Sequence, residues 1–264
     1  MTMKMMSNPA RFSSLLCGLA LAFTATSVLA DDAENVKQLA AKLAPARAHH
    51  LAVTWCSACH GPGGKSVAPT FPILAGQSDE YIVTQLQSFH NLTQDEKIAT
   101  HETMFETWIY NITGWRKPYS SYAHSDDYKY DNAPRNEERA WDFMKGVARD
   151  LDEPTMKALA EYYSKQPPAA GRVAGDAAAI DRGKTLYTEG DAGKGLIACQ
   201  MCHGPDAHGQ GPIPRLAGQH ADYVVVQLKA IQSGQRSVDQ MQAIIANLDE
   251  GDLKAVAAYV QSLN

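Results

Sequence analysis

The chain has 264 residues, of which 45% are hydrophobic, and its formal net charge at pH 7 is −5. This length suits two domains of ordinary size behind a short leader. The sequence holds no basic patch that would favour nucleic acid and no basic amphipathic stretch that would favour a membrane surface, so we expect no nucleic-acid partner.

Residues 1–30 have the pattern of a secretory signal peptide. Lys4 and Arg11 precede an apolar core at 15–23, and the segment Ser27-Val28-Leu29-Ala30 then comes before two aspartates. The core is too short to span a bilayer, and no later stretch reaches the roughly 20 apolar residues that a span needs. We expect export to the periplasm, cleavage after about Ala30 and no membrane span in the mature chain. The leader carries two basic and no acidic residues, so its removal changes the net charge from −5 to about −7.

A Cys-x-x-Cys-His pentapeptide occurs twice, at residues 56–60 and 199–203. It is the attachment signature of a c-type haem. Two thiols three positions apart on one helical turn can reach both vinyl groups of a porphyrin, and the adjacent histidine then lies under the iron. The alternatives are a disulfide, a redox pair or zinc, but zinc wants four ligands and each half offers three obvious ones. We predict two covalently attached haem c groups held by Cys56, Cys59, Cys199 and Cys202, with His60 and His203 as iron ligands.

Hydrophobic periodicity predicts an all-α fold, because helical spacing recurs and no alternating strand pattern of useful length occurs. Asp152 and Asp249 stand where an N-cap would begin the last helix of each half. Pro167 and Pro168 cannot continue the preceding helix, so residues 167–175 are predicted to be a linker. Helices are expected at residues 32–43, 81–89, 154–163, 223–231 and 248–263.

An internal repeat divides the mature chain. The Leu-Ala-Gly-Gln segment at 74–77 recurs 142 positions later at 216–219, whereas the Leu-Asp-Glu segment at 151–153 recurs 97 positions later at 248–250. The shorter offset means that the first half carries about 45 extra residues between these blocks. The predicted domains are residues 31–166, with an insertion at about 91–139, and residues 176–264.

The proline-containing loops after the motifs, at 69–72 and 212–214, offer backbone carbonyls to the second nitrogen of each histidine, which would orient its ring. On the far side of the iron we expect a methionine, because thioether sulfur suits haem iron and raises its reduction potential. In the second half this is Met241, since the other methionine there, Met201, lies inside the motif.

The methionine of the first half is contested. Chain distance from His60 favours Met104, whereas the repeat favours Met144, which precedes Leu-Asp-Glu by the same seven residues as Met241. Met156 stands at helical spacing and is better explained as core. We predict Met144 as the ligand and keep Met104 as the alternative. A histidine such as His101 or His124 comes next.

The insertion at about 91–139 is rich in aromatic residues, which often anchor binding surfaces. It has three interpretations: an extra subdomain packed on the first domain, a surface for a protein partner, or a small-molecule or metal site. The residues concerned in the insertion are Trp108, Trp115, tyrosines 110, 119, 122, 128 and 130, His90 at its edge, His101 and His124.

Other histidines, at positions 49, 50, 208 and 220, are interpreted as surface or haem-loop residues rather than ligands.

The paired haem motifs, the paired Leu-Ala-Gly-Gln segments and the methionines before Leu-Asp-Glu together resemble the class I two-domain cytochromes of the cytochrome c4 type. The resemblance covers nearly all of the mature chain except the insertion. It implies two tandem cytochrome c domains related by approximate twofold symmetry, with their haem propionate edges near one another.

The resemblance also implies a function. It points to a periplasmic di-haem protein that shuttles single electrons between redox partners, such as a quinol-oxidising complex or dehydrogenase and a terminal oxidase or reductase, by transient docking. One alternative is an electron-transfer subunit of a larger complex. Another is a di-haem enzyme such as a thiosulfate dehydrogenase or a peroxidase. Histidine plus methionine on both irons would close both faces, so we expect no catalytic residue and no enzyme.

Overall fold

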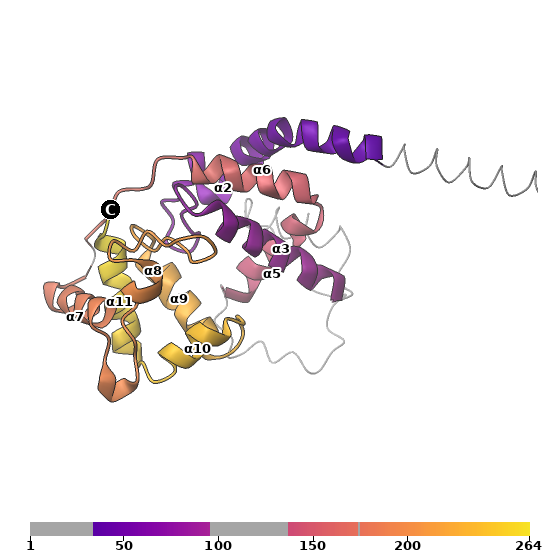
Figure 1. Ribbon diagram of the computed structural model, residues 1–264. Coiled ribbons are helices and arrows are strands. Elements are labelled where there is room, and N and C mark those ends of the chain that lie inside the picture. Colours follow the sequence, from indigo (N-terminus) through magenta and orange to yellow (C-terminus); the bar gives the residue numbers. More distant parts are fainter. Residues whose placement is uncertain (1–33, 96–136, 174) are drawn as a thin grey trace, which may run out of the picture. The chain divides into compact units, whose positions relative to one another are not determined.

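A computed structural model describes residues 34–95, 137–173 and 175–264 (Figure 1). By its contacts the chain divides into two units, Met1–Pro45 and Ala46–Asn264. In the first unit residues 34–45 are helical, which confirms the helix expected at 32–43 over its described part. The predicted features outside the described residues are the signal peptide, Met104, and the insertion's Trp108, Trp115, His101, His124 and tyrosines 110, 119, 122, 128 and 130.

The second unit begins with helical residues 46–51, which lead into a π-helical turn, η2 (Ala52–Cys56), and then α2 (Ser57–His60). Within the described ranges the only extended pairings are two isolated bridges, so the all-α prediction is confirmed. The remaining elements are η3 (Pro62–Gly64), α3 (Asp79–Asp95), α5 (Glu137–Arg149), α6 (Glu153–Ser164), α7 (Ala177–Thr188), η4 (Ala192–Lys194), α8 (Gln200–His203), α9 (Ala221–Gln232), α10 (Asp239–Ile245) and α11 (Glu250–Ser262).

The two halves of this unit use one packing scheme. In the first half α5 and α6 pack against α3, and in the second half α10 and α11 pack against α9 (Figure 1). The helix before each motif completes the scheme. In the first half residues 48–52 join the apolar cluster of α6, and in the second half α7 packs along α11. The repeat in the sequence is therefore a repeat of structure.

The last helix of each half begins as predicted. The Asp152 carboxylate accepts the N–H of Thr155 at 2.8 Å, and the Asp249 carboxylate accepts the N–H of Asp252 at 3.0 Å. Such N-caps satisfy backbone donors that have no partner inside the helix. Helix α6 ends at Ser164, ahead of the paired prolines. The domain bounds and the linker at 167–175 stay predictions.

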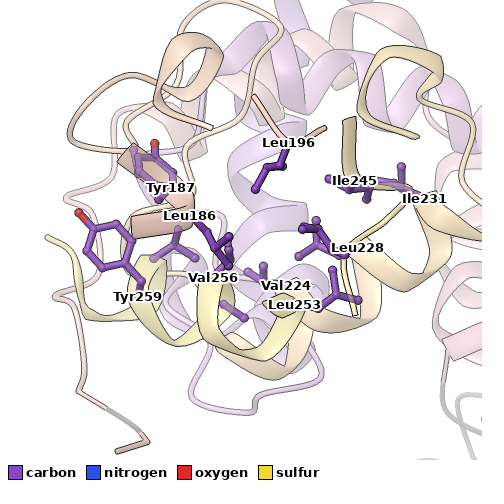
Figure 2. Packing of buried hydrophobic residues seen from close by; sticks show 14 of the residues in the cluster. Leu186, Tyr187, Leu196, Val224, Leu228, Ile231, Ile245, Leu253, Val256 and Tyr259 are labelled. Atoms are coloured by element: carbon purple, nitrogen blue, oxygen red, sulfur yellow. The ribbon is translucent and has the colours of Figure 1, made fainter. Parts of the chain in front are cut away.

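The core of the second half lies between α7, α9, α10 and α11. Figure 2 shows Leu186 and Tyr187 of α7 among Val256, Leu253 and Tyr259 of α11, and Leu186 and Tyr187 are fully buried. Close contact between α7 and α11 requires a glycine at position 183, because a Cβ there would lie 2.0 Å from the carbonyl oxygen of Ala255. The first half has a smaller buried cluster around Leu159, Ala160 and Tyr163 of α6.

No helix within residues 34–95, 137–173 and 175–264 has the length and apolar character needed to cross a membrane.

Candidate haem-binding sites

Each Cys-x-x-Cys-His motif is held on a short helix against the core of its half. Cys56 ends η2 and Cys59 lies on α2, while Cys199 precedes α8 and Cys202 lies on it. The first cysteine of each motif packs against a buried apolar cluster. All four thiols are free of disulfides. Burial raises the pKa of Cys199 to about 11, so its thiol is not a thiolate at neutral pH.

The histidine of each motif is buried and oriented by a backbone carbonyl. The Nδ1–H of His60 donates to the carbonyl of Pro72 at 2.9 Å, and that of His203 donates to Pro214 at 3.0 Å. A carbonyl can only accept, so Nδ1 carries the proton and Nε2 keeps its lone pair for a metal. Burial also lowers the pKa of both histidines, which favours the neutral form that a metal binds. The predicted carbonyl contacts are therefore present in both halves.

The loop after each motif is pinned in the same way. The carbonyl of Gly64 accepts the first two N–H groups of the Leu-Ala-Gly-Gln segment at 2.8 and 3.2 Å, and the carbonyl of Ala207 does so in the second half at 2.8 and 3.0 Å. The glycine of the segment then donates to the last helix, Gly76 to Tyr163 and Gly218 to Val260, both at 2.9 Å. The repeated segment thus joins the histidine loop to α6 or α11.

The residues present fit a haem in each half. Each half brings two thiols and an imidazole with a free Nε2, and each has a methionine on the helix that packs against α3 or α9. In the first half the buried Tyr163 hydroxyl lies against the Cys56 thiol and has no oxygen or nitrogen atom of the described residues as a hydrogen-bond partner. A bound group with a polar edge could satisfy that hydroxyl.

The predicted methionines occupy equivalent helices. Met241 lies on α10 and packs against the core of the second half, and Met144 lies half-buried on α5. Ala148 and Ile245, each four residues further on, are both buried. Predicted core residue Met156 is 3% exposed, so that prediction is confirmed.

One residue with a role here escaped the sequence reasoning. The sequence pattern places His90 only at the edge of the insertion, but its Nδ1–H donates to the carbonyl of Ala148 at 3.0 Å. In the second half Gln232 donates to the carbonyl of Ile245 at 2.7 Å. His90 and Gln232 are 142 positions apart, the repeat's own offset, which could have revealed the pair. Each side chain ties the methionine-bearing helix to α3 or α9.

The other histidines do not all lie at the surface. His50 is exposed, and His208 donates from an exposed position to the carbonyl of Asn264 at 2.8 Å. His220, however, is fully buried, with Nε2 bonded to the carbonyl of Ser66 at 2.9 Å. Of the two predicted placements, the surface is thus wrong for His220, whereas its bond to Ser66 joins it to the loop after the first haem motif.

The sequence model of the cytochrome c family matches residues 45–113 and 180–264, which is more than half of the chain and includes both motifs. The chain belongs to the cytochrome c family.

Similar proteins narrow the type of cytochrome. Cytochrome c4 of Azotobacter vinelandii is 34% identical over 215 residues, which are 79% of this chain and 84% of that protein. A solved cytochrome c4 structure from Acidithiobacillus ferrooxidans has a TM-score of 0.59 at 28% identity and covers 79% of this chain and 98% of its own. The thiosulfate dehydrogenase electron acceptor of Thiomonas intermedia strain K12 is 30% identical over 213 residues, 78% of this chain and 76% of that protein.

These likenesses confirm the resemblance drawn from the motifs. The chain is a two-domain class I cytochrome of the c4 type, with an all-α pair of cytochrome c folds. It carries two covalently attached haem c groups and transfers electrons.

Proposed function

We propose the following ligands for the two haems. The first is attached to Cys56 and Cys59, with His60 and Met144 on its iron, and the second has the equivalent set. The observation that carries this proposal is the buried histidine of each motif, whose Nδ1–H is committed to a carbonyl and whose Nε2 is left for iron. Each haem supplies an iron that takes up or gives up one electron. The second set is Cys199, Cys202, His203 and Met241.

Met144 is proposed over Met104 because its surroundings repeat those of Met241. Both methionines precede a buried residue whose carbonyl is bonded by a side chain from α3 or α9. The match to the family model includes Met104 and ends before Met144, so it does not choose between them. The packing around α5 favours Met144.

We propose that the protein is a periplasmic electron carrier, exported by residues 1–30 and cleaved after about Ala30. Histidine and methionine on both irons would let each haem take up and give up an electron without any ligand bond being made or broken. Because neither iron would then have an open coordination position for a substrate, the ligand set favours a carrier over an enzyme. Suitable partners are a quinol-oxidising complex or dehydrogenase as donor and a terminal oxidase or reductase as acceptor.

Contacts with these partners are proposed to be brief. Apolar side chains beside or within the motifs are exposed, with Trp55 60% exposed, Ile197 56% exposed and Met201 75% exposed. Transient redox contacts typically bury less than about 1,200 Å². The acidic mature chain favours a partner with a basic docking face, so the rate of electron transfer should fall as salt rises. The insertion at about 91–139 remains a candidate partner surface.

A second candidate function is that of an electron-transfer subunit bound in a larger complex. It is favoured by the similarity to a protein named as a thiosulfate dehydrogenase electron acceptor. A subunit would copurify with its enzyme, whereas a carrier would purify alone.

The ligand proposal is tested in two steps on the exported protein. Intact mass should first show two haems that acid acetone does not release. Met144→Ala should then remove half of the methionine-to-iron charge-transfer band and open one iron to carbon monoxide or cyanide. Met104→Ala is the matched control and should leave both irons closed. The converse result would move the ligand to Met104, and a mass lacking two haems would overturn the proposal.

A further inference from the structure

Two glutamines of the repeated Leu-Ala-Gly-Gln segments reach from one half of the protein into the other. Gln219 accepts the N–H of Ile73 at 2.9 Å and donates to the carbonyl of Ile73 at 3.0 Å. Gln77 accepts the N–H of Arg215 at 2.7 Å and donates to the carbonyl of Arg215 at 2.9 Å. Each side-chain amide therefore forms a two-bond clamp on a single residue of the opposite half.

The clamped residues directly follow the prolines that orient the motif histidines. The carbonyl of Pro72 and the N–H of Ile73 belong to one peptide group. That group accepts from His60 on one side and donates to Gln219 on the other. In the same way the peptide group between Pro214 and Arg215 joins His203 to Gln77. One amide unit thus separates each histidine from a glutamine of the other half.

The orientation of each glutamine amide is fixed by its partners. The Oε1 atom of Gln219 accepts a second N–H, from His220 at 3.0 Å, and Oε1 of Gln77 accepts that of Ser78 at 2.9 Å. With two N–H groups facing one atom and a carbonyl facing the other, only one assignment of oxygen and nitrogen satisfies the bonds.

The clamps are buried together with the histidines that they reach. Gln77 is 6% exposed and Gln219 7%, against 7% for His60 and 6% for His203. Away from water a hydrogen bond is stronger, and bonds in a chain polarise one another. A glutamine oxygen on the peptide N–H therefore increases the negative charge of the carbonyl oxygen. That strengthens its bond to the histidine Nδ1–H and makes the other ring nitrogen a better electron donor.

We propose that Gln219 tunes His60 and that Gln77 tunes His203, so that each iron ligand is adjusted by a positioning residue in the opposite half. A more basic histidine favours the oxidised iron, so each clamp lowers the reduction potential of the haem in the other half. The reciprocal pair makes both potentials depend on the docking of the two halves. This inference rests on the proposed histidine ligands.

The test uses the mature di-haem protein with Gln219→Ala and Gln77→Ala, followed by spectroelectrochemistry and by amide hydrogen exchange. Gln219→Ala should raise the reduction potential of the first haem and leave that of the second nearly unchanged. At a fixed applied potential its ratio of reduced to oxidised iron should rise on the order of twofold to tenfold, since a fraction of one hydrogen bond is lost. The Ile73 amide should exchange faster while Arg215 stays protected. Gln77→Ala should give the opposite pattern.

Two further variants separate tuning from damage. Gln261 is 6% exposed and also forms two backbone bonds, but with Ala221 of its own half and with Arg172 of the predicted linker, not with the opposite half. Gln261→Ala should therefore change the reduction potential of neither haem. Gln219→Glu keeps an acceptor for the Ile73 N–H, so that amide should stay protected even if the alanine variant folds poorly.

Equal shifts of both haems would overturn the proposal. So would a shift of the haem in the substituted half, or faster Ile73 exchange with unchanged potentials. If the wild-type protein has two histidine-ligated haems but the two alanine variants show no crossed pattern, the clamp proposal alone is refuted. Wild-type protein without two histidine-ligated haems would instead refute the proposed function, and the amide exchange would still report on the clamp.

Discussion

Substitution of His90 tests how the first methionine is held in place. His90→Ala removes the hydrogen bond to the carbonyl of Ala148, which lies four residues beyond Met144. That carbonyl also accepts the N–H of Leu151 at 3.1 Å, so the substitution does not leave it without a partner. The lost hydrogen bond to Ala148 accounts for about 1 kcal/mol. If Met144 ligates the first iron as proposed, the equilibrium in which it leaves the iron should then shift about fivefold toward the open form.

Cyanide binding to the oxidised protein measures this opening, because an external ligand can bind only after methionine has left. The first haem of His90→Ala should bind cyanide about fivefold faster than wild type, in proportion to the open fraction. The second haem should be unchanged. His90→Gln is the matched control, since Gln232 makes the same contact in the second half. An unchanged rate in His90→Ala, or an equally fast rate in His90→Gln, would refute this role.

Two further predictions concern the second half. Gly183→Ala should cost about 1–3 kcal/mol in thermal unfolding, because overpacking against the carbonyl of Ala255 outweighs the better helix propensity of alanine. Gly251→Ala, whose Cβ meets only the movable side chain of Asp249 at 3.1 Å, should destabilise less than Gly183→Ala. Lys194 donates to Asp249 at 2.7 Å and holds the pKa of Asp249 below its ordinary value. The stabilisation that this ion pair gives is thus full above about pH 4 and is lost as the pH falls through the folded-state pKa of Asp249. Asp249→Asn should therefore match the stability of wild type at low pH and be less stable near pH 7.

The features that the sequence predicted correctly are those set by short-range chemistry. The spacing in the haem motifs, the N-caps Asp152 and Asp249, and the prolines that end α6 all act within one or two turns of chain. The carbonyl contacts of His60 and His203 follow from loops only about a dozen residues long. Such features can be predicted from residue types at fixed spacing, because few other conformations satisfy them.

The features that the sequence did not predict depend on contacts between distant segments. Gln77 and Gln219 were recognised as part of a repeat, but a repeat does not show that its members cross to the opposite half. His220 has no local pattern that separates a surface histidine from the fully buried one observed. The segment that leads into each haem motif also differs between the two halves, and the sequence gives no clear signal of this difference. Residues 46–51 run through η2 directly into α2, whereas a loop with η4 separates α7 from α8.

The insertion of the first half is compatible with the shared packing scheme because of where it lies. It separates the end of α3 from α5, and the contacts that define the scheme lie on either side of it. His90 on α3 bonds Ala148 on α5, and α5 packs along α3 as α10 packs along α9. The segment between them can therefore lengthen by about 45 residues at a modest entropic cost, because the cost of closing a loop rises only with the logarithm of its length. The site of Met144 is fixed by α3, and not by the length of the chain that leads to it.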